Sequence, residues 1–249
     1  MTRRALTTSK DHLNKTLITL IFLAATSILA CAAPARSVDT MHDPDTRQAQ
    51  QDASTWDEDP RLLASVDPNA FDAPAARAAI FSATNDQRLA HGLDALPHEP
   101  SLDASSQLHA ERMRDHNFFA HEDPTSSTYR TPDDRARAVG VANPRLAENI
   151  ATQISLDYTS GEPVYGKIGG AKGQFSRTPD GPLIPPVSYV VLAREVVKGW
   201  MNSPGHRKNI LHADAVSLGT GAAFYWENNF PAIYAVQNFQ FFEPLQGDQ

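Results

Sequence analysis

The segment from residue 189 to residue 211 constrains the fold of this chain most strongly. Apolar residues recur through its first part at helical spacing, which predicts a helix with one wide buried face. These residues are Tyr189, Val190, Leu192, Ala193, Val196, Val197, Trp200 and Met201. Ser203, Pro204, Gly205 and His206 follow directly. We interpret Pro204 and Gly205 as the stop of this helix, which places His206 on a rigid turn where an imidazole can bind a ligand or carry a proton. A plain capping turn is the alternative interpretation.

Other segments predict both helices and strands. Cap residues, proline and glycine mark the ends of three predicted helices. Runs of alternating or apolar residues predict three strands. The helices are expected at about 72–92, from about 101, and at 131–140, and the strands at 148–154, 216–226 and 232–242. The pattern indicates an α+β fold in which helices flank a sheet. Residues 155–187 are rich in glycine and proline and show neither period, so we predict a long surface insertion that is not part of the core. His109 falls on one face of the second helix and is predicted to be buried in helix packing.

The first thirty residues have the organisation of an export signal. Basic residues up to Lys15 precede an apolar run over 16–30, which is too short to span a bilayer comfortably. The run ends at Cys31, the single cysteine of the chain, in a context that resembles a bacterial lipobox. We therefore predict a signal peptide over 1–30 and an acylated Cys31 that anchors a cell-envelope lipoprotein in the membrane. Ordinary cleavage near 33–35, which gives a secreted protein, is the alternative. With one cysteine there is no intramolecular disulfide, so the fold must rely on core burial.

Composition after Cys31 predicts a flexible acidic tether over 31–71, because Ala, Asp, Gln and Pro dominate and the bulky apolar residues are sparse. Local docking of the apolar cluster around Leu62 is the alternative for that part of the tether. The whole chain has a formal charge of -7, and the first thirty residues carry +3, so the remainder stands at -10. Such an acidic surface repels phosphate backbones, and no nucleic-acid partner is expected. Residues 244–249 are interpreted as a tail.

Four ordered motifs together resemble those of the bacterial branch of the CAP superfamily, relatives of cysteine-rich secretory proteins, venom antigen 5 and plant pathogenesis-related class 1 proteins. The motifs are 85–88 with 92–93 (NDQR and GL), 118–121 (FFAH), 146–151 (LAENIA) and 200–211 (WMNSPGHRKNIL). The resemblance covers about 74–242 and implies one domain over 72–243. It implies a three-layer α-β-α sandwich with a central, mainly antiparallel sheet.

In that family two histidines and two glutamates line a central cleft, and in some members the histidines bind zinc. By motif, His121 and His206 match the histidines and Glu148 matches one glutamate, although Ala147 replaces the usual preceding glycine. Ser203 occupies the position of the second glutamate. The resemblance thus implies a cleft with Glu148 and Ser203, in which His121 and His206 hold zinc or another divalent cation weakly. A purely structural pairing of His206 with Glu148 is the alternative. Glu122 and Asp123 are further acidic candidates beside His121.

Three functions are compatible with these residues. The first is an envelope-anchored, non-catalytic binder of a small apolar or envelope ligand, as the family resemblance implies. The second is a divalent-metal-assisted hydrolase of peptide or envelope polymer, with Glu148 as general base. The third is a structural or partner-binding surface module.

Overall fold

The computed structural model describes residues 53–159, 161–167 and 170–242 of the chain. Its helical elements are η1 (Ala53–Glu58), α2 (Pro60–Leu63), α3 (Ala73–Ala90), α4 (Pro100–His116), α5 (Pro132–Ala138), α6 (Tyr189–Asn202) and α7 (Pro204–Ile210). Its strands are β1 (Leu146–Ile154), β2 (Tyr165–Gly166), β3 (Phe175–Ser176), β4 (Ser217–Glu227) and β5 (Phe230–Gln240). None of the helices in these described residues is long and apolar enough to cross a membrane.

The main sheet is antiparallel, with the strand order β1-β5-β4. The central strand β5 is buried along its whole length. A two-residue turn, Asn228 and Asn229, joins β4 to β5, and both residues have positive φ (48° and 70°). Hairpin turns of type I′ need positive φ at both central positions, and asparagine tolerates that conformation better than most residues. The predicted pair of C-terminal strands is confirmed, with a shorter connection than the sequence suggested.

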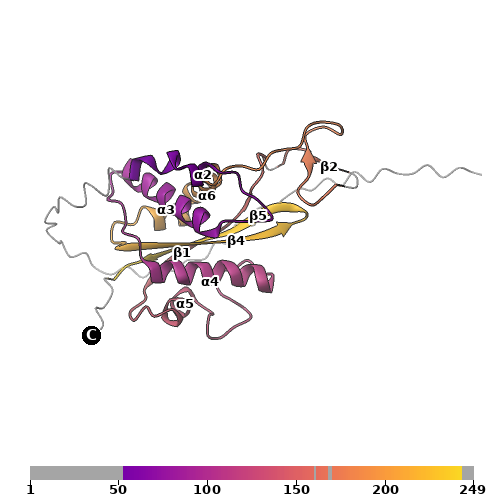
Figure 1. Ribbon diagram of the computed structural model, residues 1–249. Coiled ribbons are helices and arrows are strands. Elements are labelled where there is room, and N and C mark those ends of the chain that lie inside the picture. The colour runs from indigo at the N-terminus through magenta and orange to yellow at the C-terminus, as the bar shows by residue number, and fades with distance from the viewer. Residues whose placement is uncertain (1–52, 160, 168–169, 243–249) are drawn as a thin grey trace, which may run out of the picture.

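Helices cover both faces of this sheet, as Figure 1 shows. α3 and α6 pack on one face, and α4 and α5 lie on the other, so the predicted three-layer α-β-α sandwich is confirmed. Two glycines of β4 allow α4 to lie directly on the strand. A Cβ at Gly219 would come within 2.3 Å of the Leu102 backbone, and one at Gly221 within 2.2 Å of the Ser106 backbone. Any side chain at either position would therefore push α4 away from the sheet.

Local signals fixed most helix ends as expected. The Asp72 carboxylate accepts a hydrogen bond from the Ala75 amide at 3.0 Å and caps α3. Thr131 and Asp134 form a reciprocal capping box at the start of α5. The apolar face of α6 is buried as predicted, with Trp200 donating its indole N–H to the Ile150 carbonyl at 3.1 Å.

The interpretation of Pro204 and Gly205 as a helix stop is wrong in part. α6 does end at Asn202, but Pro204 is the first residue of a second helix, α7, and Gly205 and His206 lie in its first turn. Proline suits the first helical position because its missing N–H has no partner there in any case. His206 therefore sits on a helix N-terminus and not on a free turn.

Residues 53–66 correct the expected tether. They form η1 and α2, and Trp56, Leu62 and Val66 are buried in the main core. The Trp56 indole N–H donates to Asp86 of α3 at 2.8 Å. This part of the predicted tether is packed on the domain. The predicted signal peptide, Cys31 and the first part of the tether lie outside the described residues, as does the tail.

The insertion over 155–187 projects beyond the β4–β5 end of the sheet (Figure 1). Its ends meet, because the Val187 amide donates to the Ser155 carbonyl at 2.9 Å. The insertion contains the short pair β2–β3 and contributes Leu156 and Ile184 to a small cluster with Phe230. The insertion is therefore peripheral, as predicted, but it has apolar packing of its own.

Candidate functional site

Two neighbouring residues of β1, Glu148 and Asn149, position the two predicted histidines. Successive side chains of a strand point to opposite faces of a sheet. Glu148 accepts a hydrogen bond from His121 Nδ1 at 3.0 Å on one side. On the other side Asn149 donates its amide to the His206 carbonyl at 3.2 Å. The Glu-Asn pair thus fixes one histidine from each side of β1, which lies at the edge of the main sheet.

The Glu148 carboxylate is sealed inside the protein, with a side chain that is 1% exposed. Arg135 donates to Oε2 at 2.7 Å, His121 donates to Oε1, and His109 Nε2 lies 3.7 Å from Oε1. Burial alone raises the pKa of this carboxyl, but the facing His109 and Arg135 and the bond from His121 outweigh burial and lower it. Glu148 is therefore an ionised carboxylate that is almost completely shielded from solvent.

His121 is the most accessible member of the site, with a side chain that is 48% exposed. A carboxylate can only accept hydrogen bonds, so Nδ1 carries the proton that Glu148 receives. In the neutral ring Nε2 then keeps its lone pair and is the nitrogen left to contact a ligand. Phe119, two residues earlier, is 50% exposed and stacks on Tyr234 with ring centroids 6.0 Å apart. An exposed aromatic ring therefore lies close in sequence to the exposed imidazole.

His206 is half-buried, and the contacts that hold it in place are made by its backbone carbonyl and by its helix, α7. Besides the bond from Asn149, the α7 residue Asn209 donates to Asn149 Oδ1 at 2.9 Å, which ties the helix to β1. Burial lowers the pKa of His206, and the nearby charge of His121 lowers it further. The two imidazoles are thus within electrostatic range of each other. No hydrogen bond joins His206 to Glu148 among the described contacts; the strand holds His206 through Asn149 instead.

The remaining predicted residues serve other contacts. Ser203 joins α6 to α7 through its backbone and makes no side-chain cap. Glu122 is exposed and pairs with Arg130 at 2.8 Å. Asp123 is buried and bonded by Arg112 and Thr125; burial opposes ionisation, but these bonds lower its pKa to about 2. Neither acidic residue therefore joins Glu148 in the site.

Sequence reasoning missed Arg135. Its side chain is fully buried, and its Nη atoms donate to the carbonyls of Tyr129, Arg130 and His121 (3.0 to 3.1 Å) as well as to Glu148. Arginine in a short helix rich in charged residues normally indicates a solvent-facing side chain. No signal in the local sequence marks Arg135 as buried.

His109 is buried in helix packing as predicted, yet it also faces the site. Its Nε2 donates to the Ala120 carbonyl at 3.0 Å, and its Nδ1 has no hydrogen-bond partner among the described residues. Burial is the main cause that lowers the pKa of His109 to about 4. His109 is therefore neutral at pH 7 and helps to exclude water from Glu148.

The donors around His121 supply only part of the ligand set of a divalent cation. His121 Nε2 and His206 can offer two imidazoles, and the Glu148 partner of His121 is of the kind that orients metal-binding histidines. Glu148 itself is occupied by Arg135. Within the described ranges no group of three or more His, Cys, Asp or Glu residues is placed to hold a metal. A catalytic zinc normally has three protein ligands, so the residues present do not form a complete zinc site.

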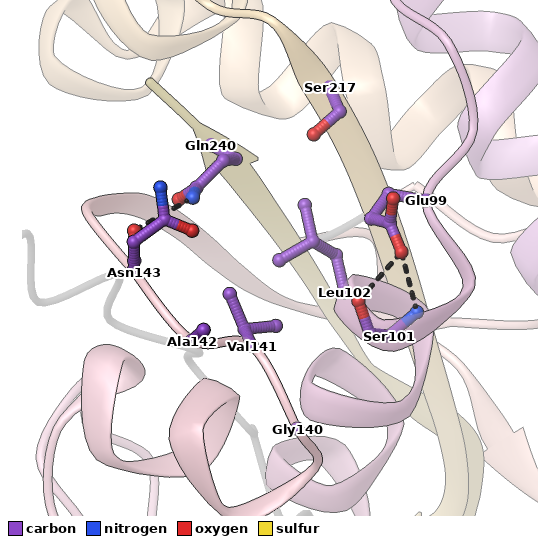
Figure 2. Close-up of a pocket in the computed structure, with 9 residues that line it drawn as sticks. All are labelled: Glu99, Ser101, Leu102, Gly140, Val141, Ala142, Asn143, Ser217 and Gln240. Atoms are coloured by element: carbon purple, nitrogen blue, oxygen red, sulfur yellow. Dashed lines mark hydrogen bonds between the residues drawn. The ribbon is translucent and has the colours of Figure 1, made fainter. Parts of the chain in front are cut away.

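Two of the cavities formed by the described residues lie away from this site. The smaller, of about 90 Å³, lies between the start of α4, the loop over 140–143 and the start of β4, as Figure 2 shows. In it the buried Ser217 hydroxyl has no partner among the residues described. A polar space of this size suits a few ordered water molecules. The larger cavity, between α3 and α4, is treated below. Neither is lined by His121, Glu148 or His206.

Comparison with known proteins places this geometry in a family. The chain is 32% identical over 142 residues to "Uncharacterized protein YkwD" of Bacillus subtilis strain 168, covering 57% of this chain and 40% of that protein. It is 29% identical over 152 residues to "Uncharacterized membrane protein YlbC" of the same organism, covering 61% of this chain and 33% of that protein. The chain thus spans less than half the length of either relative.

Among solved structures, an extracellular protein containing an SCP domain from Bacillus anthracis matches with a TM-score of 0.46 and 25% identity. The match covers 68% of this chain and 41% of that one. The sequence model of CAP, the cysteine-rich secretory protein family, matches residues 81–239, a span that includes every residue of the site described above. The chain belongs to the CAP family.

Proposed function

We propose that this protein is exported, is held at the cell envelope through acylated Cys31, and binds a small apolar or envelope ligand at the His121–His206 face without turning it over. The observation that carries the proposal is the state of Glu148. Both of its oxygens are engaged and its side chain is 1% exposed. A general base must reach the proton that it removes, and this carboxylate has no path to a substrate.

The surface around His121 supports an apolar ligand. Phe119 exposes half of its area and already stacks on Tyr234, and Tyr234 in turn stacks on Tyr225 at 4.1 Å. Of these three rings Phe119 is exposed, whereas Tyr234 is buried and supports it from below. An exposed aromatic ring beside a few fixed polar groups is typical of sites that bind partly apolar molecules. In this proposal the aromatic rings give contact area, and the two imidazoles give orientation through hydrogen bonds.

Binding of Nile red, an uncharged apolar probe, tests this proposal with purified full-length protein. We expect a saturable rise in fluorescence that Phe119→Ser and the pair His121→Ala, His206→Ala each weaken by about fivefold or more, because each removes contacts of the bound probe. Matched controls are Leu63→Ser, which alters an equally exposed apolar residue, and the pair His91→Ala, His116→Ala at exposed positions. Equal losses in site and control variants would contradict a site at this face.

Metal-assisted hydrolysis is the second candidate, and one observation favours it: Glu148 holds His121 Nδ1 and leaves Nε2 free for an ion. Calorimetric titration with zinc, followed by a peptide and cell-wall hydrolysis screen, separates the candidates. Zinc-dependent turnover that His206→Ala abolishes would replace the binding proposal with the hydrolase. If the probe does not bind and nothing is hydrolysed, a structural or partner-binding module becomes the better conclusion.

A further inference from the structure

A groove of about 300 Å³ lies between α3 and the first turn of α4, with Thr220 of β4 among its lining residues. Arg77, His98 and Asp103 contribute its charged or titratable side chains, and Pro74, Ala78 and Phe81 contribute apolar walls. None of these residues belongs to the His121–His206 face. The groove is thus a second, chemically mixed surface in the same domain.

The acceptor of this groove is already satisfied. Asp103 Oδ1 accepts from the Thr220 amide at 2.7 Å, and Oδ2 accepts from His98 Nε2 at 2.7 Å. The side chain of Asp103 is only 14% exposed. The His98 ring is also held edge-on against Phe81 at 5.4 Å, so the residues beside Asp103 are fixed by several contacts. Asp103 therefore has little capacity left to receive a hydrogen bond from a ligand.

The donor of the groove is not satisfied. The nearest approach of Arg77 to Asp103 is 3.9 Å, from Nη1 to Oδ2, which is longer than a hydrogen bond. Arg77 Nε is buried and has no hydrogen-bond partner within the described part of the chain. A buried guanidinium N–H without an acceptor is costly, since it has lost water and gained nothing in exchange. Arg77 thus has Asp103 as a distant ion-pair partner through Nη1, while its Nε–H has no acceptor among the described residues.

We propose that this groove binds a small organic carboxylate with an apolar body. Its carboxylate accepts from the guanidinium of Arg77, whose side chain is 27% exposed and makes no hydrogen bond to Asp103, and Ser82 at the same groove offers a hydroxyl. Its body lies against Pro74, Ala78 and Phe81, which a bare inorganic anion would leave in contact with water. This site is independent of the function proposed for the His121–His206 face.

Benzoate is the probe for this site, with the uncharged benzamide as its matched control and inorganic phosphate as the control for charge alone. Binding to full-length protein is followed by amide chemical shifts in ¹⁵N-labelled samples. We expect saturable shifts around the groove with benzoate and an affinity about tenfold weaker for benzamide, because a hydrogen bond to a charged group contributes about that factor. Phosphate should also bind about tenfold more weakly, because it buries none of the apolar wall. Arg77→Gln is expected to weaken benzoate binding by about tenfold, whereas Arg137→Gln at an exposed site leaves it unchanged.

A filling variant covers the case in which Arg77→Gln alters folding. Ala78 is an exposed residue of α3, so Ala78→Leu suits a helix and occupies the groove while it leaves Arg77 in place. We expect it to block benzoate, whereas Ala90→Leu, at the far end of the same helix, does not. The pair His121→Ala, His206→Ala should bind benzoate as the unaltered protein does. Binding that persists in Ala78→Leu, or phosphate or benzamide binding as tightly as benzoate, would overturn the proposal.

Discussion

Replacing Glu148 by glutamine tests whether this residue is a structural centre. The carboxylate and the Arg135 guanidinium are both buried and in contact at 2.7 Å. Two unit charges about 4 Å apart attract by about 4 kcal/mol at an effective dielectric constant of about 20. Removing one partner of a buried pair typically costs about 3–5 kcal/mol. The glutamine oxygen can still accept from Arg135, so we expect the free energy of unfolding to fall by about 3 kcal/mol.

Urea denaturation at pH 7, followed by tryptophan fluorescence, to which the buried Trp56 and Trp200 contribute, measures this change. Glu122→Gln is the matched control, because it alters a glutamate in an exposed ion pair with Arg130, and exposed pairs contribute little to stability. A stability change below about 1 kcal/mol in Glu148→Gln would refute the reasoning. If the same variant instead lost a hydrolytic activity while it kept its stability, Glu148 would have to be assigned to catalysis.

Three other predictions concern packing and pH. Gly221→Ala should lower the free energy of unfolding by about 3 kcal/mol or more in urea denaturation, because its Cβ would meet the Ser106 backbone. Gly199→Ala has open space around its Cβ in α6 and should raise the free energy of unfolding by about 1 kcal/mol. Similar effects in both variants would contradict the close approach of α4 to the sheet. Trp56→Ala should cost about 3 kcal/mol if residues 53–66 are part of the domain, and an unchanged denaturation midpoint would show that they are not. His109 has its ordinary pKa of 6.5 in the unfolded state and a pKa of about 4 in the folded state. The unfolded state therefore binds a proton first, and this residue should remove about 3 kcal/mol of stability as the pH falls from 6.5 to 4. Denaturation at several pH values should show a smaller loss of stability over that interval in His109→Asn.

Much of the fold could be predicted because its signals are local. Asp72 and Thr131 are strong caps, and the spacing of apolar residues in α6 has one interpretation. Pro204 was misread because a proline that ends one helix and a proline that begins the next produce the same local pattern. Only the packing of α7 against β1 decides between them.

The unpredicted parts depend on contacts between distant segments. Trp56, Leu62 and Val66 are sparse apolar residues in a polar stretch, so average composition predicts a tether, although all three are buried in the main core. In the candidate site the family motif located His121, Glu148 and His206, but their arrangement depends on Arg135. Nothing in its local sequence separates a buried arginine that binds three carbonyls from a solvated one.

The two ends of the insertion, near Ser155 and Val187, lie side by side and form a closed neck, which affects how such a protein can evolve. Ser155 and Val187 are hydrogen-bonded at 2.9 Å, and Asp157 and Pro185 are bonded the same way one step outward. A segment whose two ends already meet can be lengthened, shortened or exchanged while the path of the main sheet stays the same, since closing the loop costs little entropy. The insertion can therefore change in length and sequence during evolution while β1, β5 and the residues that hold His121 and His206 stay the same. Related domains are expected to differ from one another mostly in this insertion, and a transplanted insertion would need an apolar residue at the position of Phe230 in β5 to complete its small core.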